Sequence, residues 1–221
     1  GKQEEGVCYD FVADKVRGPL LVVVPGADGS APLFAIGKYE ASVGEFNLYC
    51  AETNACVPIA ANNDKLPVTG IKIRDARGYA KWLSDRASTL SSKPVIYRLP
   101  NADEWRHAAA AGGETPVRGI NCKPEGGATL SSGLMRSEGG TLSLGVPIGR
   151  ALVSATFGGE NGWGVVNAVG NAQEWVTATG GLLAKGGAFQ DPVAACSIQS
   201  NRPHDGDPDG ITGFRLLREL K

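Results

Sequence analysis

The chain has 221 residues, and its 22 Lys and Arg against 23 Asp and Glu give a formal net charge of −1. This length fits one domain or two small ones and allows roughly 70% of the unfolded surface to be buried. The near-neutral charge gives no electrostatic reason to expect nucleic acid or anionic lipid as a partner. The longest apolar run, residues 19–25, is far too short to cross a bilayer, so we expect no direct membrane insertion of this fragment.

The N-terminal segment, residues 1–18, mixes charges without a pattern, and we interpret it as an extension or linker before one domain over 19–221. The sequence starts at Gly1 without a signal peptide, which favours a processed protein or a piece of a longer one. The apolar run at 20–24, followed by Pro and Gly, predicts a buried strand that ends in a turn. The moderate alternation over 34–40 predicts a second strand.

Two helices are predicted next, each from a capping residue followed by apolar positions at helical spacing. Ser42, with Glu45 three residues later, forms a capping box at the start of a helix over 42–50. Asp75 is the expected N-cap of a longer helix over 73–87, which has an apolar stripe at helical spacing.

A third, short helix is predicted over 102–111, because Asn101 and Glu104 form another cap and two glycines follow. Residues 112–160 are rich in Gly, Ser and Thr, and this segment is too long for an ordinary connection. It is expected either to carry short strands or to form a functional surface. Gly makes up 31 of the 221 residues, so we expect much loop and many short strands.

Five cysteines allow two disulfides. Cys50 and Cys56 either close a small disulfide loop or are two free thiols at a helix end. Cys122 and Cys196 are the other candidate pair, which leaves Cys8 over. Disulfides would imply an extracytoplasmic compartment, either periplasmic or secreted.

Motifs for zinc and for common catalytic classes are missing from the sequence. The only histidines are His107 and His204, and no C-x-x-C occurs, so a tetrahedral zinc site is not expected. No G-x-S-x-G, P-loop or H-E-x-x-H is present. Residues 205–210 open like an EF-hand loop, but Leu216 stands where a bidentate Glu belongs, so we interpret them as turn residues.

Four motifs in a fixed order carry a family resemblance. They are Tyr97-Arg98-Leu99-Pro100, Gly170-Asn171-Ala172-Gln173-Glu174-Trp175, Lys185-Gly186-Gly187-Ala188-Phe189 and Gly213-Phe214-Arg215-Leu216. Together they resemble the formylglycine-generating (sulfatase-modifying factor) family over residues 34–217. The resemblance implies an α+β fold of the C-type-lectin-like kind, with small twisted antiparallel sheets, few helices and much loop.

The resemblance also implies a calcium site. The family pattern Asn-x-x-Gly-x-Ala-x-Glu falls on Asn167, Gly170, Ala172 and Glu174. Calcium takes six to eight oxygen ligands in irregular geometry, which suits a mixture of backbone and side-chain oxygens. The alternative interpretation is that Asn167 and Glu174 only hold turns together.

Catalysis in the family depends on two cysteines that hold copper(I). The resemblance places Cys196 at the second of these positions and Asp191 at the first. A carboxylate is a hard ligand, whereas copper(I) selects soft thiolates. We therefore expect no copper site, and the sequence favours a protein that is not an enzyme. The related sulfoxide synthases need three histidines for iron, and the chain has two.

What is left is the surface that family oxidases use as a peptide groove. The candidate ligand-binding residues there are Trp175, Asn201, Arg202, His204, Asp205 and Asp207. Aromatic and Arg side chains in a concave site are good binding anchors. We therefore expect a non-catalytic, extracytoplasmic domain that recognises a protein or a small-molecule ligand.

The resemblance includes members of two such kinds. They are the sensor regions of transmembrane serine/threonine kinases and the periplasmic regulators of type VI secretion. Two alternatives stand beside this hypothesis. One is a copper-dependent formylglycine-generating oxidase that acts on a sulfatase cysteine and tolerates Asp191. The other is a C-type-lectin-like binding protein diversified by a retroelement, which predicts variation at exposed positions within 190–212.

Overall fold

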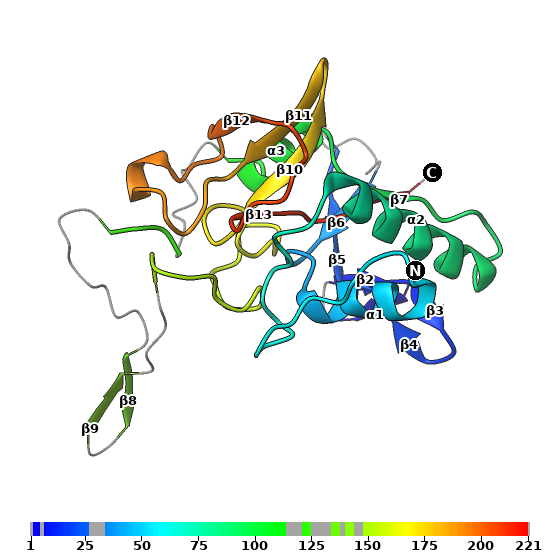
Figure 1. Ribbon diagram of the computed structural model, residues 1–221, viewed down its shortest axis with the longest axis horizontal. Coiled ribbons are helices and arrows are strands. Elements are labelled where there is room, and N and C mark those ends of the chain that lie inside the picture. Colours follow the sequence, from blue (N-terminus) through cyan, green and yellow to red (C-terminus); the bar gives the residue numbers. More distant parts are fainter. Residues whose placement is uncertain are drawn as a thin grey trace.

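The computed structural model describes residues 2–4, 7–26, 34–113, 121–124, 134–137, 140–143 and 148–220. Within these ranges the chain forms three α-helices and several small sheets, joined by long loops (Figure 1). Few helices and much loop are the features predicted for the α+β fold. The predicted Gly-rich segment 112–160 lies partly outside the described ranges, but it contains the antiparallel pair β8 (Leu134–Ser137) and β9 (Gly140–Ser143).

The larger sheet has six strands in the order β1-β2-β5-β6-β14-β7. Their bounds are β1 (Lys2–Glu4), β2 (Val7–Tyr9), β5 (Leu21–Val24), β6 (Phe34–Gly37), β14 (Leu217–Glu219) and β7 (Tyr97–Arg98). The predicted strands over 20–24 and 34–40 are therefore confirmed, and the second one ends at Gly37. The N-terminal segment is an ordered extension, because β1 and β2 join this sheet. β3 (Phe11–Ala13) pairs with β4 (Val16–Arg17) in a small hairpin.

The smaller sheet has four strands in the order β12-β11-β10-β13. Their bounds are β10 (Gln173–Ala178), β11 (Gly181–Lys185), β12 (Asn201–His204) and β13 (Thr212–Gly213). A short 3-10 helix, η3 (Val193–Ala195), lies between β11 and β12 along the chain. This sheet contains parts of three of the four family motifs, and it carries five of the ten predicted metal- and ligand-binding residues.

Helix α1 (Val43–Thr53) begins as predicted. The Ser42 hydroxyl accepts the backbone N–H of Glu45 at 3.3 Å, and the Glu45 carboxylate accepts the backbone N–H of Ser42 at 2.9 Å. These reciprocal bonds satisfy two N–H groups that the first helical turn leaves without partners. Helix α3 (Ala102–Ala110) has the same kind of capping box between Asn101 and Glu104, also as predicted.

Helix α2 (Ile73–Thr89) begins at the predicted residue but has a different cap. Its N-cap is Lys72, and Asp75 lies at the third helical position, so the prediction of Asp75 as the N-cap was wrong. From there the Asp75 carboxylate reaches back to the backbone N–H of Lys72 at 3.4 Å. An acidic side chain at this position satisfies the free N–H from inside the helix, so the cap needs no polar side chain of its own.

The hydrophobic core has two parts. The first lies between α1, α2 and the larger sheet and includes Phe46, Tyr79, Leu83 and Phe214. The second packs α3 and the smaller sheet against strands β5 and β6 and includes Trp105. Trp175 belongs to the first part and Val176 to the second, so strand β10 contributes to both.

Candidate functional site

The register of the smaller sheet brings distant residues onto one face. Trp175 lies opposite Ala184, and Ala184 lies opposite Arg202, while His204 lies opposite Leu182. Because strand residues alternate between faces, Gln173, Trp175, Arg202 and His204 share one face of this sheet. The structure thus brings together three of the six predicted ligand-binding residues, joined by Gln173.

Arg202 is fixed by an ion pair with Asp191. Its guanidinium lies 2.8 Å from the Asp191 carboxylate and 3.2 Å from the side-chain oxygen of Gln173. The same Asp191 carboxylate also accepts the backbone N–H of Ala188 at 2.7 Å. Asp191 is mostly buried, whereas 40% of the Arg202 side chain is exposed. Asp191 therefore shapes the turn after β11 and holds Arg202 at the surface.

Both predicted disulfides are present. Cys122 is bonded to Cys196, and Cys50 is bonded to Cys56, which leaves Cys8 as the free cysteine. The cysteine at the second family copper position is thus joined to a residue 74 positions earlier in the sequence.

His204 is held by hydrogen bonds on both ring nitrogens. The backbone N–H of Gly206 donates to Nδ1 at 2.9 Å, so Nε2 carries the proton and donates to the Asp209 carboxylate at 3.2 Å. Burial alone would raise the pKa of Asp209, but hydrogen bonds from Thr212, Ile211 and His204 hold it below the usual value. Asp209 therefore stays an anion that anchors the loop after β12.

Trp175 supports this surface from beneath. Its side chain is fully buried, and its ring meets the His204 ring edge to face, with 5.4 Å between the ring centroids. Its indole N–H is the buried side-chain polar atom without a hydrogen-bond partner among the described residues. Trp175 cannot touch a ligand directly in this arrangement, although it fixes the position of His204.

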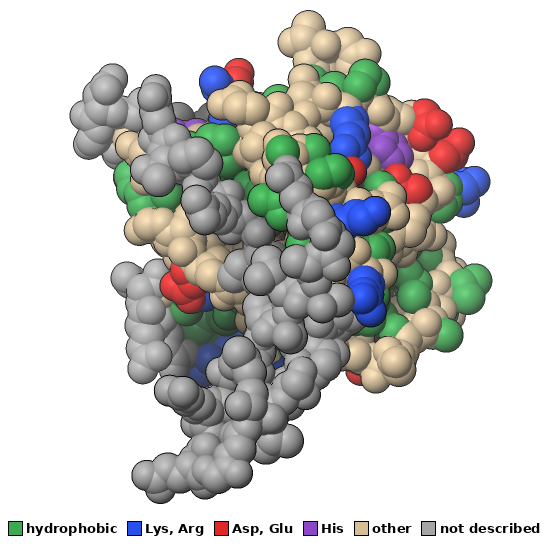
Figure 2. Space-filling model, turned by 90° about the vertical axis from the view of Figure 1, so that its left-hand side faces the viewer, with side chains coloured by type: hydrophobic (Ala, Val, Ile, Leu, Met, Phe, Trp, Pro, Cys, Tyr) green, Lys and Arg blue, Asp and Glu red, His purple; other side chains and the backbone are tan. Residues whose placement is uncertain are grey.

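The remaining three predicted ligand residues do not converge on one point. Asn201 is exposed and, as the neighbour of Arg202 in β12, lies on the opposite face of the sheet. Asp205 and Asp207 are exposed in the loop, where Asp205 accepts the backbone N–H of Asp207 at 2.9 Å. This bond is typical of the turn predicted for 205–210. On the face shown in Figure 2, acidic and basic side chains border a histidine.

Glu174 and Arg215 form an almost fully buried ion pair, each with 1% exposure. Three contacts of 2.6–2.9 Å join the guanidinium to the carboxylate, and the Trp105 indole donates to the same carboxylate at 2.7 Å. Arg215 also donates to the backbone oxygens of Gly37 and Val166, both at 2.9 Å. One guanidinium thus connects β6, β10 and the loop before β10.

A second buried carboxyl, Glu40, lies beside this pair. It accepts hydrogen bonds from the side chains of Asn167 and Asn171 and from the backbone N–H of Ala172. Burial, together with repulsion from Glu174, raises the pKa of Glu40 to about 8, against the opposing effect of Arg215. The amides of Asn167 and Asn171 therefore tie Glu40 to the turn before β10.

Two of the four predicted calcium ligands, Asn167 and Glu174, already bond to other groups of the protein, and the calcium site stays a prediction. The Glu174 carboxylate is taken by Arg215 and Trp105, and the Asn167 amide N–H groups point to Glu40 and the Phe157 carbonyl. At Gly170 the backbone adopts φ of +80° and lies tightly against Cys122. A calcium ion needs oxygens that are not already bonded to N–H donors. Within the described residues, no three His, Cys, Asp or Glu side chains gather in a metal-binding group.

Because Arg215 and Trp105 occupy the Glu174 carboxylate, we expect calcium to leave the melting temperature of the protein unchanged. A metal that binds only the native state raises stability by mass action, so thermal unfolding in calcium and in EGTA measures binding directly. The matched variant is Glu174→Ala. A calcium-dependent rise in melting temperature that this variant removes would contradict the expectation and support the calcium prediction made from the sequence.

Two features of the site could not be recognised from the sequence. The Gly-Phe-Arg motif was noted, but nothing indicated that Arg215 pairs with Glu174, because the two residues lie 41 positions apart. Glu40 follows a strand in a segment with no acidic pattern, so nothing in the sequence indicated that its carboxyl group is buried. An Arg between the apolar residues Phe214 and Leu216 was the one available hint, since buried Arg side chains are almost always paired.

The fold and the site define an α+β domain of the C-type-lectin-like formylglycine-generating type. The Sulfatase-modifying factor enzyme 1-like domain matches residues 13–220, so the chain belongs to that family. No curated protein sequence matches the chain.

Three solved structures are similar in fold. PvdO from Pseudomonas aeruginosa has a TM-score of 0.64 at 18% identity, with 100% of both chains covered. Treponema denticola variable protein 1 has a TM-score of 0.59 at 16% identity and covers 90% of this chain and 94% of its own. CarF has a TM-score of 0.59 at 21% identity and covers 98% of this chain and 97% of its own. At these identities the likeness concerns the fold alone.

Proposed function

We propose that this domain binds a protein or small-molecule ligand outside the cytoplasm and does not perform the oxidase chemistry of its family. The proposal rests on how the residues are bonded at the two positions where family oxidases hold copper(I). Asp191 is bonded to Arg202, and Cys196 is bonded to Cys122.

These contacts oppose copper chemistry at both positions. Copper(I) is held by soft thiolates, and a carboxylate is a hard ligand. Cys196 would first have to be reduced, and Asp191 would have to leave the guanidinium of Arg202. Even then the pair would offer one thiolate instead of two.

The surface around Arg202 and His204 suits recognition of a polar ligand. Arg202 is partly exposed and held at a fixed position by Asp191 and Gln173, and the acidic side chains of Asp205 and Asp207 lie along the adjoining loop. A binding group that is already held in place loses little conformational entropy when a ligand arrives. Arg is also among the residues that contribute most to interfaces.

The compartment in our proposal follows from the cysteines. Two disulfides favour an oxidising environment, either the periplasm or the cell exterior. None of the helices among the described residues has the length and apolar character needed to cross a bilayer. We propose a sensing or regulatory role within a longer protein, such as the sensor region of a transmembrane serine/threonine kinase or a type VI secretion regulator.

An oxidation assay tests the non-catalytic part of the proposal. Protein supplied with copper(I), oxygen and a Cys-x-Pro-x-Arg peptide is expected to give no formylglycine product by mass spectrometry. An active family oxidase run beside it shows that the assay works. Conversion of the peptide by the wild-type chain would contradict the proposal and favour the oxidase alternative.

A variant provides the matched control for the ligand argument. Asp191→Cys combined with Cys122→Ser gives both family positions a free thiol. Copper(I) binding by this variant but not by the wild-type chain would support the assignment of Asp191 as the residue that removes the copper site. Equal copper binding by both proteins would overturn that assignment.

A further inference from the structure

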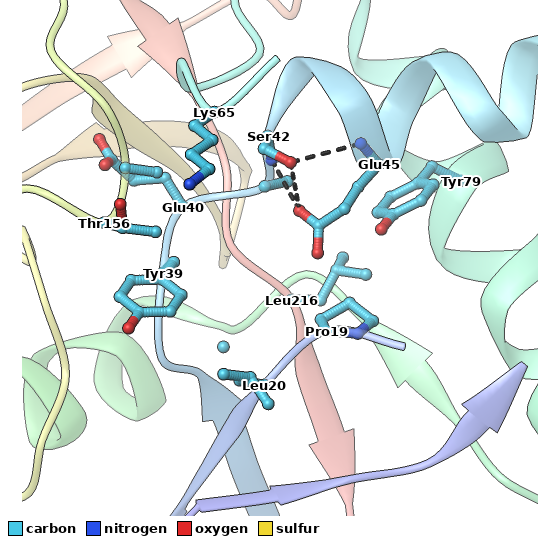
Figure 3. A pocket seen from close by; sticks show the side chains of 13 residues that line it. Pro19, Leu20, Tyr39, Glu40, Ser42, Glu45, Lys65, Tyr79, Thr156 and Leu216 are labelled. Carbon is cyan, nitrogen blue, oxygen red and sulfur yellow. Dashed lines mark hydrogen bonds between the residues drawn. The ribbon is translucent and has the colours of Figure 1, made fainter. Parts of the chain in front are cut away.

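A cavity of about 230 Å³ opens between β6, the start of α1 and two loops of the described chain. It shares none of its lining residues with the surface around Arg202 and His204. Most of its wall is apolar, formed by residues such as Pro19, Leu20 and Leu216, and the rings of Tyr39 and Tyr79 complete it (Figure 3). This volume is smaller than the roughly 300–1,000 Å³ of drug-sized ligand sites, so it suits a small metabolite.

One carboxylate oxygen of Glu45 in this cavity has no partner among the described residues. Glu45 Oε2 accepts the backbone N–H of Ser42 at 2.9 Å and its hydroxyl at 2.8 Å. The other oxygen makes no hydrogen bond or ion pair with any described residue. Burial raises the pKa of Glu45, while the two bonds from Ser42 oppose this change. A carboxylate in apolar surroundings without a cation is costly unless a positive group reaches it.

The Tyr79 hydroxyl faces the same cavity (Figure 3). Tyr79 has 1% exposure, and its hydroxyl has no hydrogen-bond partner among the described residues. Figure 3 shows this hydroxyl and the Glu45 carboxylate directed toward the same space. Burial, together with the Glu45 charge, raises the pKa of Tyr79 well above its ordinary value, so the phenol stays neutral. The same cavity is thus lined by a neutral hydroxyl and by a carboxylate.

A positive charge stands across the cavity. Lys65 lines the opening opposite Tyr79 (Figure 3), and its ammonium forms no ion pair with a described residue. Its backbone is fixed by hydrogen bonds to the Asn63 side chain at 2.9 Å and to the N–H of Ala155 at 2.8 Å. The carboxylate of Glu40, which also lines the cavity, is already bonded to Asn171 and Ala172.

From this geometry we propose that the cavity binds a small zwitterion with an apolar body, the chemistry of a free apolar amino acid. Its ammonium group bonds to the Glu45 carboxylate and the Tyr79 hydroxyl. Its carboxylate faces the Lys65 ammonium, and its side chain packs on the apolar wall. Charge-assisted hydrogen bonds of this kind are shorter and stronger than neutral ones. The half-buried Glu45 carboxylate gains a cationic partner, and the exposed Lys65 ammonium gains an anionic one.

Calorimetric titration with three related probes tests the charge pattern. L-leucine carries both charges, isoamylamine lacks the carboxylate, and 4-methylpentanoate lacks the ammonium group. We expect leucine to bind and each analogue to bind about tenfold more weakly or worse, since each loses one charge-assisted contact. If neither leucine, isoleucine, valine, methionine nor phenylalanine binds at millimolar concentration, the proposal is overturned.

Variants assign the contacts to residues. Tyr79→Phe removes a hydroxyl that has no protein partner, so it leaves the fold intact, and it is expected to weaken leucine binding about tenfold. Glu45→Gln keeps the capping-box geometry but loses the negative charge, so it is expected to reduce binding further. Lys65→Met should selectively weaken the amino acid and not isoamylamine. Lys81→Met, on the exposed side of α2, is the matched control.

Unchanged leucine binding in Tyr79→Phe and Glu45→Gln would place the amino acid elsewhere and overturn the assignment. Thermal melting of each variant shows whether it is folded, and Tyr79→Phe carries the test if Glu45→Gln unfolds. The result does not depend on the oxidation assay, because that assay concerns Asp191 and Cys196, which do not line this cavity.

Discussion

Replacing Arg215 with methionine is expected to lower the free energy of unfolding by about 3–5 kcal/mol, because it leaves a buried charge without its partner. Glu174 has 1% exposure, and Arg215 supplies three of its contacts. The variant also frees the carbonyl oxygens of Gly37 and Val166, which accept from the same guanidinium. Methionine fills much of the space, so the loss measures the polar contacts and not a cavity.

Urea unfolding of the wild type and the variant measures this effect. The control is Lys81→Met, which breaks an exposed pair with Asp85 four residues along α2 and is expected to cost about 0.3–0.5 kcal/mol. Adding Glu174→Gln to Arg215→Met should recover part of the loss, because it removes the uncompensated carboxylate. Similar losses in Arg215→Met and Lys81→Met would mean that the buried pair does not hold the domain together.

Removing the Cys122–Cys196 disulfide is expected to cost more than removing Cys50–Cys56. The first bond closes a loop of 74 residues and the second a loop of 6. The loss of chain entropy in the unfolded state grows with loop length, which gives about 4 kcal/mol for the longer loop and about 2 kcal/mol for the shorter one. The expected difference between the two disulfides therefore comes from the entropy of the unfolded chain more than from contacts in the native state.

Paired alanine variants, Cys122→Ala with Cys196→Ala and Cys50→Ala with Cys56→Ala, are compared by urea unfolding. Peptide mapping without reductant should find both bonds in the wild type and one thiol, at Cys8. Equal losses in the two double variants would contradict the loop-length argument. Five free thiols in the mapped protein would remove the basis for an extracytoplasmic location.

The parts of the fold that the sequence predicted well are those set by nearby residues. The capping boxes at Ser42 and Asn101 involve partners three positions apart, so a short window of sequence contains both. Asp75 was predicted to be the N-cap of α2 but lies at the third helical position, because a carboxylate suits both positions. The sequence thus indicated the kind of cap at all three helices, and it misplaced the capping residue only at α2.

The site was harder to predict because its contacts join distant segments. Arg202 was selected as a ligand contact, but its ion pair with Asp191 depends on the turn after β11. Trp175 looked like a binding anchor, yet strand alternation within a small covered sheet buries it. Glu45 was identified only as a helix cap, since its second oxygen matters only where β6, α1 and two loops meet.

The order of strands in the larger sheet also constrains when the domain can form during synthesis. β14 lies between β6 and β7, although it follows them by well over a hundred positions in the sequence. A nascent chain must expose residue 219 from the ribosome before these two strands acquire their common neighbour. Such late, long-range pairing is slow and leaves strand edges open meanwhile. The unfinished chain therefore keeps one edge of β6 unpaired until β14 has been synthesised.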